Sequence, residues 1–458
     1  MKELLLLSSL GIISLIAEIL NLRKLIYPIV ILGLLLNIGF CINDLGKNEN
    51  IYDMLVLDKV SLVFIILTSF ISILWFTMAR SFFTDETNLS DHFSLVLFSL
   101  VGVFILISYK HMAMLFLGVE ILSIPVYVLA GSNKRSLFSN ESAFKYFLLG
   151  SFASGFLLLG ITFVYGAVGS FSILQLASSS LLQVGVSKQL LMVGVLLILF
   201  AMAFKMSAVP FHFWAPDVYT GAPTVVTSYM ATIVKIGAVA GFYRLFGIVL
   251  AFYKEYTLVL LVISVLTILI GNVIAASQTN VKRMLAYSSI GHAGFLILGI
   301  TMLSVSTPFI TWYYLLSYTL SSIAAFWVLL LLAPQEEEED IAIFKGLVKR
   351  SPVLAFTMTI ALLSMAGIPP LSGFFAKYFV LVNVIYNNQM AIAVVAILAS
   401  LVGVYYYFKI IIAMFNTADD TGPVLAISTF HKVFLMSLSI LIIFIGIVPD
   451  FILRIFFK

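Results

Sequence analysis

The chain has 458 residues, of which 62% are hydrophobic and 10% charged, and its mean hydropathy is +1.15. Soluble domains carry about 25% charged residues, so this composition excludes a soluble globular protein and predicts a polytopic membrane protein. A net charge of +4 without a dense basic block argues against nucleic-acid binding, and the single cysteine, Cys41, excludes an internal disulfide, a cysteine-ligated iron–sulfur cluster and a CxxC metal site.

The first twenty residues, MKELLLLSSLGIISLIAEIL, combine a leading lysine with an apolar run, as a signal peptide does. Glu3 and Glu18 flank that run, however, and no small-residue cleavage site closes it. We therefore expect this segment to be the first membrane helix.

About fourteen apolar runs meet the requirement of roughly 20 apolar residues for a helix that crosses a bilayer core about 30 Å thick. They cover residues 4–20, 25–42, 60–79, 94–109, 112–130, 143–167, 189–209, 224–250, 256–275, 285–303, 308–333, 353–385, 391–414 and 431–452. Unpaired backbone groups are too costly in hydrocarbon, and the chain shows no ten-residue alternating segments, so helices are the expected spanning element. A slight excess of Lys and Arg in alternate loops favours an outward N-terminus without deciding the orientation.

Two of these runs contain prolines that interrupt the helical pattern. Pro210 lies in KMSAVPFHFWAPDVYTGAPT of the seventh run, and Pro369–Pro370 in SMAGIPPLSGFFAKYF of the twelfth. Proline removes a backbone donor and clashes with the preceding turn, so helices 7 and 12 are expected to be broken. Paired interruptions of this kind point to inverted repeats with an ion site near the membrane midplane.

The predicted organisation has four parts. They are residues 1–90 with helices 1–3, 91–253 as repeat one with helices 4–8, 254–416 as inverted repeat two with helices 9–13, and 417–458 with helix 14. Five helices in each repeat, an odd number, force the second repeat to run upside down relative to the first. Aligning the two proline breaks leaves Lys205 and Lys377 out of register, so the repeat stays a hypothesis.

The most polar connector is PQEEEEDIAIFKGLVKR at 334–350. Its acidic run suits a solvated loop that leads into a helix, which is the favoured interpretation. A contact with a partner protein is the alternative.

Ionisable residues inside apolar runs are the functional candidates, because a charge at mid-membrane costs on the order of 3 kcal/mol. The candidates are Glu120, Lys145, Lys205, Lys235, His292 and Lys377. Lys145 lies close to the start of its run, and the histidine could equally be a hydrogen-bonded core residue. Glu18 and Lys409 lie near helix ends, from which long side chains reach the interface.

Buried lysines suit proton transfer. Burial disfavours the charged ammonium and a nearby carboxylate favours it, so a lysine whose partner comes and goes takes up and releases a proton. Moving a proton across about 200 mV costs roughly 4.6 kcal/mol, and making or breaking a buried ion pair is on that scale. Glu120 lies in the middle of a span, so we expect it within salt-bridge or one-water distance of Lys205.

A second expectation concerns depth. Lys205, Lys235, His292 and Lys377 are predicted to lie in one band near mid-membrane, linked by water or hydroxyl groups. Candidate hydroxyl groups around the histidine are those of Tyr287, Ser288 and Ser289.

A family resemblance follows from these segments. FKMSAVPFHFWAPDVYTGAPTVVTSYMATIVKIGA at 204–238 resembles the broken seventh helix and the eighth helix of the antiporter-like subunits of NADH:quinone oxidoreductase, respiratory complex I. LGVEILSIPVYVLAG at 117–131, ESAFKYFLLGSFASGFLLLGI at 141–161, NVKRMLAYSSIGHAGFLI at 280–297 and MAGIPPLSGFFAKYFV at 365–380 follow in family order. The resemblance covers roughly residues 90–415. Within the family the chain is similar to the N-type subunits, because L-type subunits continue into a long lateral helix and M-type subunits have Glu where this chain has Lys377.

The resemblance implies a role for each candidate. Glu120 matches the helix-5 glutamate, Lys205 its helix-7 partner, Lys145 the helix-6 lysine, Lys235 the central helix-8 lysine, His292 a helix-10 relay position and Lys377 the terminal helix-12 residue. Asp217 and the prolines around it are assigned to the structure of the break, and Lys409 is left unassigned.

The implied function is proton translocation coupled to electron transfer in other subunits, in a bacterial inner membrane. The resemblance implies no cofactor and no metal in this subunit, with FMN, iron–sulfur clusters and quinone in partner subunits, and other membrane subunits of complex I and the lipid bilayer as partners. The chain has no GxGxxG turn, P-loop or HExxH motif. Alternatives are a subunit of a multisubunit cation/proton antiporter or membrane-bound hydrogenase, and an independent transporter of a small solute, for which the mostly lysine set offers little polarity.

Overall fold

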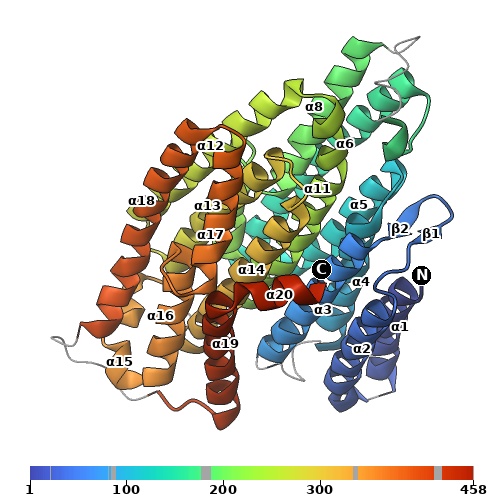
Figure 1. The fold of residues 1–458 in the computed structure, drawn as a ribbon. Helices are drawn as coiled ribbons and strands as arrows, with labels where there is room; N and C mark the ends of the chain where they lie inside the picture. The colour runs from blue at the N-terminus through green and yellow to red at the C-terminus, as the bar shows by residue number, and fades with distance from the viewer. Residues whose placement is uncertain are drawn as a thin grey trace. The chain divides into compact units, whose positions relative to one another are not determined.

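The computed structural model describes residues 1–20, 22–80, 82–83, 89–176, 187–333, 339–416 and 425–456. The described helices form two compact units, Met1–Leu260 and Leu261–Lys458 (Figure 1). The first contains α1 (Lys2–Ile19), α2 (Arg23–Asn43), α3 (Lys59–Ala79), α4 (Leu89–Ser108), α5 (Met112–Ala130), α6 (Leu137–Val168), α8 (Lys188–Lys205), α9 (Trp214–Gly221), α10 (Thr224–Tyr229) and α11 (Lys235–Phe252). Helix α12 (Glu255–Ser277) begins in this unit and continues into the second.

The second unit continues with nine helical elements. They are α13 (Val281–Thr301), α14 (Thr307–Leu332), a short 3₁₀ turn (Ile341–Phe344), α15 (Leu347–Arg350), α16 (Pro352–Ala366), α17 (Ser372–Tyr386), α18 (Met390–Phe415), α19 (Thr429–Ile447) and α20 (Pro449–Phe456).

The predicted spans are confirmed as helices. Within the described residues, 12 helices are long and apolar enough to cross a membrane, and α16 and α17 are shorter apolar helices. Each predicted run coincides with one helix or with consecutive helical elements. Helices α4 and α6 begin several residues before their predicted runs, because their first residues include polar ones, such as Asp91 in α4 and Asn140 in α6, which an apolar run leaves out. The predicted last run ends early, at Ile447, since Pro449 starts the separate helix α20.

Both predicted breaks are present. Helix α8 ends at Lys205, and the chain resumes a helix only at Trp214, so Pro210 lies in the gap. Helix α16 ends at Ala366 and α17 begins at Ser372, with Pro369–Pro370 between them. Both gaps carry a cis peptide bond before proline, Val209–Pro210 and Pro369–Pro370.

Two local features were not predicted. A small antiparallel hairpin, β1 (Glu49–Ile51) with β2 (Leu55–Leu57), connects α2 to α3. A π-turn, Met230–Val234, joins α10 to α11 inside the predicted eighth helix. Neither feature leaves a composition signal, because the hairpin strands have three residues each and the π-turn is as apolar as its flanks.

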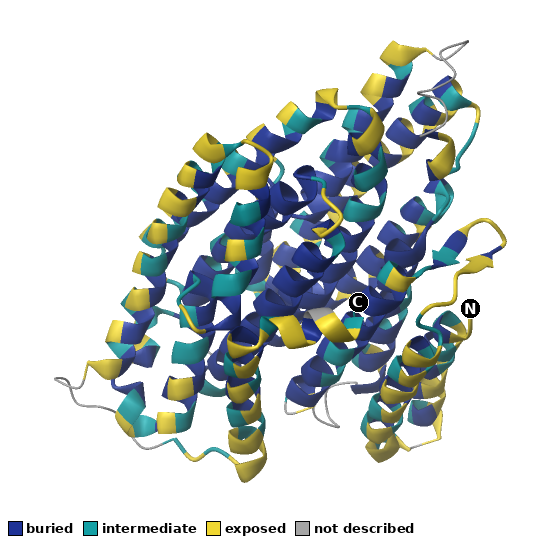
Figure 2. Cartoon of the chain, viewed as in Figure 1, coloured by how far each residue is buried: buried dark blue, intermediate teal, exposed yellow. Residues whose placement is uncertain are grey.

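The burial pattern separates core helices from peripheral ones (Figure 2). In the first unit 89% of the apolar span of α3 is buried, and in the second unit 94% of that of α13. Only 33% of the spans of α2 and α18 is buried. The burial of each candidate residue therefore depends on the helix that carries it.

The four-part division and the inverted relation of the two repeats remain proposals.

Candidate functional site

Lys205 is the last residue of α8 and its side chain is 6% exposed. Its ammonium group donates to the hydroxyl oxygens of Ser123, at 2.7 Å, and Tyr127, at 3.1 Å. Both acceptors are on α5, the helix that carries Glu120. A buried ammonium is thus held by neutral oxygens.

Glu120 does not form the expected ion pair. Its half-buried carboxylate accepts a hydrogen bond from the Ser154 hydroxyl of α6, and no ion pair with Lys205 is formed within 4 Å in the part of the chain that the structure describes. A direct ion pair is therefore not formed in this conformation, while the other form of the expectation, a separation bridged by one water, stays a prediction. Glu120, Ser123 and Tyr127 are spaced by three and four residues, which places them on one face of α5. The Ser123 hydroxyl lies one turn from the carboxylate and contacts the lysine.

Aromatic rings enclose this lysine from the side of the break. The Lys205 Nζ lies 5.4 Å from the centre of the Tyr127 ring and 5.9 Å from that of Tyr146. Tyr146 stacks on Trp214, the first residue of α9, with ring centres 4.5 Å apart. The Trp214 indole donates to the Phe204 carbonyl at 3.0 Å. It thereby satisfies one of the carbonyl groups that the end of α8 leaves without an intrahelical partner.

Lys145 is paired with two carboxylates. Its ammonium group lies 2.6 Å from the Glu141 carboxylate, one turn earlier on α6, and 2.9 Å from that of Asp217 on α9. The side chain is 38% exposed, so Lys145 is less buried than Lys205. Sequence reasoning assigned Asp217 to the break alone. Its ion pair with Lys145 was missed because the partners are far apart in the sequence.

Lys235 lies directly after the π-turn and is 2% exposed. It is the first residue of α11, in a span of which 78% is buried. π-Turns inside α-helices are frequent at functional sites. The expectation of a deeply buried lysine on the eighth helix fits this placement.

In the second unit, Lys377 lies on α17 and is half-buried. Its ammonium group donates to the carbonyl oxygen of Ala366, at 2.9 Å, and lies 5.6 Å from the centre of the Phe295 ring. The break thus frees a backbone carbonyl beside the lysine, as the proline pair suggested. The lysine itself is a partner of that carbonyl.

His292 is 7% exposed, and both of its ring nitrogens lie near tyrosine hydroxyls. Nδ1 is 2.8 Å from the Tyr314 hydroxyl of α14, and Nε2 is 3.3 Å from the Tyr407 hydroxyl of α18. Ser288 joins the cluster through its hydrogen bond with Tyr407. The two tyrosines were not predicted as partners, whereas Ser288 was.

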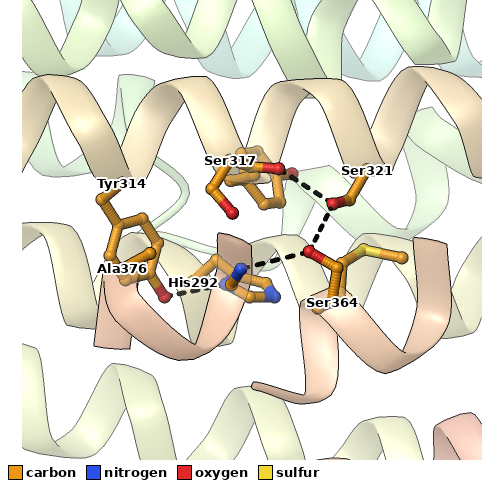
Figure 3. A pocket seen from close by; sticks show the side chains of 9 residues that line it. His292, Tyr314, Ser317, Ser321, Ser364 and Ala376 are labelled. Atoms are coloured by element: carbon orange, nitrogen blue, oxygen red, sulfur yellow. Dashed lines mark hydrogen bonds between the residues drawn. The ribbon is translucent and has the colours of Figure 1, made fainter. Parts of the chain in front are cut away.

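Serine hydroxyls line the same small cavity as this histidine (Figure 3). Ser321 donates to Ser364 at 2.9 Å, and Ser317 donates to Ser372 at 2.8 Å. The hydroxyl oxygens of the two acceptors, Ser364 and Ser372, are 3.3 Å apart. These serines come from α14, α16 and α17, so they meet at the second break. Side chains of this group line a cavity of about 10 Å³, which is on the scale of one water molecule. Its lining comprises His292, Tyr314, Ser317, Tyr318, Ser321, Ser364, Met365, Gly373 and Ala376.

Two further charges have structural partners. Lys409 donates to the carbonyl oxygens of Ala276, at 3.2 Å, and Gln278, at 3.3 Å, around the end of α12. Glu18 forms an ion pair with Arg23 and accepts from Ser90. This agrees with the interpretation of Glu18 as a residue near a helix end.

The structure thus places five of the six candidates, all but Lys235, around the two breaks. Glu120, Lys145 and Lys205 lie around α5, α6 and the first break, and His292 and Lys377 lie around the second. Among the described residues, no three His, Cys, Asp or Glu side chains are grouped so that they could hold a metal ion.

Comparisons with known proteins agree on one family. Residues 110–403 match the family described as NADH:quinone oxidoreductase/Mrp antiporter, TM. The chain is 42% identical to NADH-quinone oxidoreductase subunit N of Cytophaga hutchinsonii, over 99% of each chain. Its structure is similar to a chain of respiratory complex I from Thermus thermophilus with bound Aureothin, with a TM-score of 0.83, 28% identity and coverage of 99% of this chain and 98% of that one. It also has the fold of a chain of the Mrp complex from Dietzia sp. DQ12-45-1b, with a TM-score of 0.88, 20% identity and coverage of 99% and 95%.

Proposed function

This chain belongs to the NADH:quinone oxidoreductase/Mrp antiporter family, and we propose that its intramembrane lysines, glutamate and histidine carry the protons that it translocates. Its activity is that of a proton-translocating membrane subunit of an NADH:quinone oxidoreductase. The 42% identity to a subunit N favours this complex over a cation/proton antiporter or hydrogenase, since the Mrp likeness, at 20% identity, concerns the fold alone.

The first step of the proposed route takes place around Lys205. Its ammonium group is held by two neutral hydroxyls, and neutral acceptors stabilise a buried cation less than a carboxylate does. A small shift toward Glu120 favours the charged lysine, and a shift away favours release of the proton. The observation that carries the proposal is that Lys205 is hydrogen-bonded to Ser123 and Tyr127, two hydroxyls on the face of α5 that also carries Glu120.

The second step takes the proton along the remaining carriers. Lys235 is the proposed central carrier, His292 the relay and Lys377 the terminal group. Imidazole suits a relay because one ring nitrogen accepts a proton while the other donates one. The tyrosine hydroxyls beside both nitrogens of His292 supply hydrogen-bonded positions for that exchange.

The proposed partners follow from the relatives. We place the chain in a multisubunit membrane complex of a bacterial inner membrane, beside other membrane subunits. Electron transfer through FMN, iron–sulfur clusters and quinone is assigned to other subunits. The peripheral helices with mostly unburied apolar spans, such as α2 and α18, offer surfaces for lipid or for those subunits.

The test is proton pumping by the assembled complex with Lys205→Ala or Glu120→Gln. Loss of a proton-transfer group lowers a rate by roughly 100-fold or more. We expect pumping and the coupled NADH oxidation to fall together in both variants while the subunit still assembles. Wild-type pumping by an assembled Lys205→Ala complex would refute the proposed route.

A further inference from the structure

A buried ion pair lies outside the proposed route, at one end of the second unit. Lys282, in the first turn of α13, has its Nζ 3.3 Å from Oε2 of Glu339, and the side chains are 7% and 5% exposed. The acidic run was interpreted from the sequence as a solvated loop. Residues 334–338 lie outside the described part of the chain, and Glu339 is buried, so the interpretation is wrong for this residue.

Backbone hydrogen bonds fasten the two segments on either side of the ion pair. The Val281 amide donates to the Glu339 carbonyl at 2.8 Å, and the Ile341 amide donates to the Thr279 carbonyl at 3.1 Å. Asn280 and Asp340 form the antiparallel bridge between these bonds. We call residues 279–282 and 339–341 the clasp. It ties the start of α13 to the segment that follows α14.

A second tie reaches the same place from α18. Lys409 donates to the Ala276 and Gln278 carbonyls, which directly precede the clasp. The start of α13 is therefore tied to the segment that follows α14 through Glu339, and the end of α12 just before it is tied to α18 through Lys409. Helices α14 and α18 carry Tyr314 and Tyr407, the hydroxyl partners of His292.

The charge of the clasp calls for an explanation. Backbone bonds alone would hold the two segments, and a buried ion pair is costly to desolvate, so apolar side chains would serve as well for mere anchoring. An ion pair, in contrast, fixes one relative placement of the two segments through charge and geometry. His292 lies ten residues beyond Lys282 on α13, about 15 Å along the helix. A shift of the start of α13 is thus passed to the imidazole along a rigid element.

We propose that Lys282, Glu339 and Lys409 are positioning residues for His292, which set α13 against α14 and α18 so that both imidazole nitrogens meet their tyrosine hydroxyls. This inference rests on the proposed function, since it matters only if His292 relays protons.

The test uses the whole oxidoreductase complex with Glu339→Gln, and Asp340→Asn as the matched control. Asp340 is the neighbouring acid, half-buried, and contributes only its backbone to the clasp bridge. We expect Glu339→Gln to lower the rate of proton pumping by roughly fivefold, the effect of about one lost hydrogen bond, and Asp340→Asn to leave this rate unchanged. The exchanged pair Lys282→Glu/Glu339→Lys should recover most of the loss. Equal pumping by Glu339→Gln and Asp340→Asn, or no recovery by the exchanged pair, would overturn the proposal.

A second measurement tests the proposal even if the Glu339→Gln complex does not assemble. Lys409→Met removes the tie from α18 without touching the ion pair, and we expect faster deuterium exchange of the amides of α13 around His292. Unchanged exchange would overturn the proposal. His292→Gln separates the two hypotheses. If it abolishes pumping while Glu339→Gln pumps at the wild-type rate, only the clasp is wrong, and if it pumps normally, the proposed relay itself is wrong.

Discussion

Lys377 reaches back across the second break and donates a hydrogen bond to the carbonyl oxygen of Ala366, at 2.9 Å. Ala366 is the last residue of α16, just as Lys205 is the last residue of α8. Both lysines are therefore associated with the carbonyl end of a first half-helix, where the helix dipole favours a positive charge. In the sequence, Lys205 precedes its proline and Lys377 follows its proline pair. This similarity was therefore not predicted, because the sequence does not show how far a lysine side chain reaches back.

We expect Lys377→Ala to lower proton pumping on the order of 100-fold, and Lys377→Arg to fail similarly, because a guanidinium keeps its proton at any working pH. Gly367→Ala adds a test that leaves the lysine in place. Gly367 has a φ of +87°, and a Cβ there would lie 2.9 Å from the Lys377 Cδ, so the lysine side chain must shift. Pumping by assembled complexes is the measurement, and wild-type pumping by the arginine variant would exclude Lys377 as an obligatory carrier.

Gly150 packs closely against the Tyr127 hydroxyl that binds Lys205. A Cβ at Gly150 would lie 2.1 Å from that hydroxyl, whereas a Cβ at Gly155 on the same helix would meet nothing within 4 Å. Overpacking of this kind costs about 1–3 kcal/mol. We expect Gly150→Ala to reduce pumping and Gly155→Ala to leave it unchanged, both measured in assembled complexes. A Gly150→Ala complex that pumps like the Gly155→Ala one would show that the Tyr127–Lys205 contact is dispensable.

Asp217 and Glu141 both pair with Lys145, but only Asp217 links it to another helix, α9. Ion pairs this exposed contribute about 1 kcal/mol or less, so we expect Asp217→Asn to lower pumping by no more than roughly fivefold. Glu141→Gln is the control, because it removes a carboxylate of the same helix and leaves the tie between α6 and α9. The prediction is wrong if the two variants have equal effects on pumping.

Tyr314→Phe removes the hydroxyl beside His292 Nδ1, and leaving a buried polar atom unpaired costs about 1–3 kcal/mol. We expect a several-fold loss of pumping in Tyr314→Phe complexes. Tyr313→Phe is the neighbouring control, since that buried hydroxyl donates to the Ile445 carbonyl at 3.0 Å. Comparable losses from both substitutions would point to general packing of α14 in place of a role for His292.

The membrane helices and both breaks were predictable, because apolar length and proline act locally. The hydrogen-bonding partners of the candidate residues inside the bundle were less predictable. Serine and threonine hydroxyls in apolar helices often bond to their own backbone, as Ser72 does to the Thr68 carbonyl, so composition does not tell which hydroxyls cross between helices. The spacing of Tyr314, Ser317 and Ser321 along one face of α14 was the signal available for the serine group.

Charges near the loops were misjudged for a related reason. Lys282 and Glu339 both lie beside polar sequence, which indicates solvent, yet their pairing removes both from it. Glu120 and Lys205 were paired because Glu120 is the carboxylate in the middle of a span. Hydroxyls from α5 and α6 satisfy them separately.

A π-turn holds about one residue more than an α-helical turn, so the one at Met230–Val234 rotates everything after it by about 100° relative to an uninterrupted helix. The face that α11 presents to the interior, with Lys235 on it, exists only in this phase. Removing one residue from the turn would swing the lysine to a different side of the helix while leaving the composition of the span unaltered. Relatives that lack the extra residue would have to carry their inward-facing lysine at a neighbouring position, and an ungapped alignment across Thr224–Phe252 would then compare side chains that point in different directions.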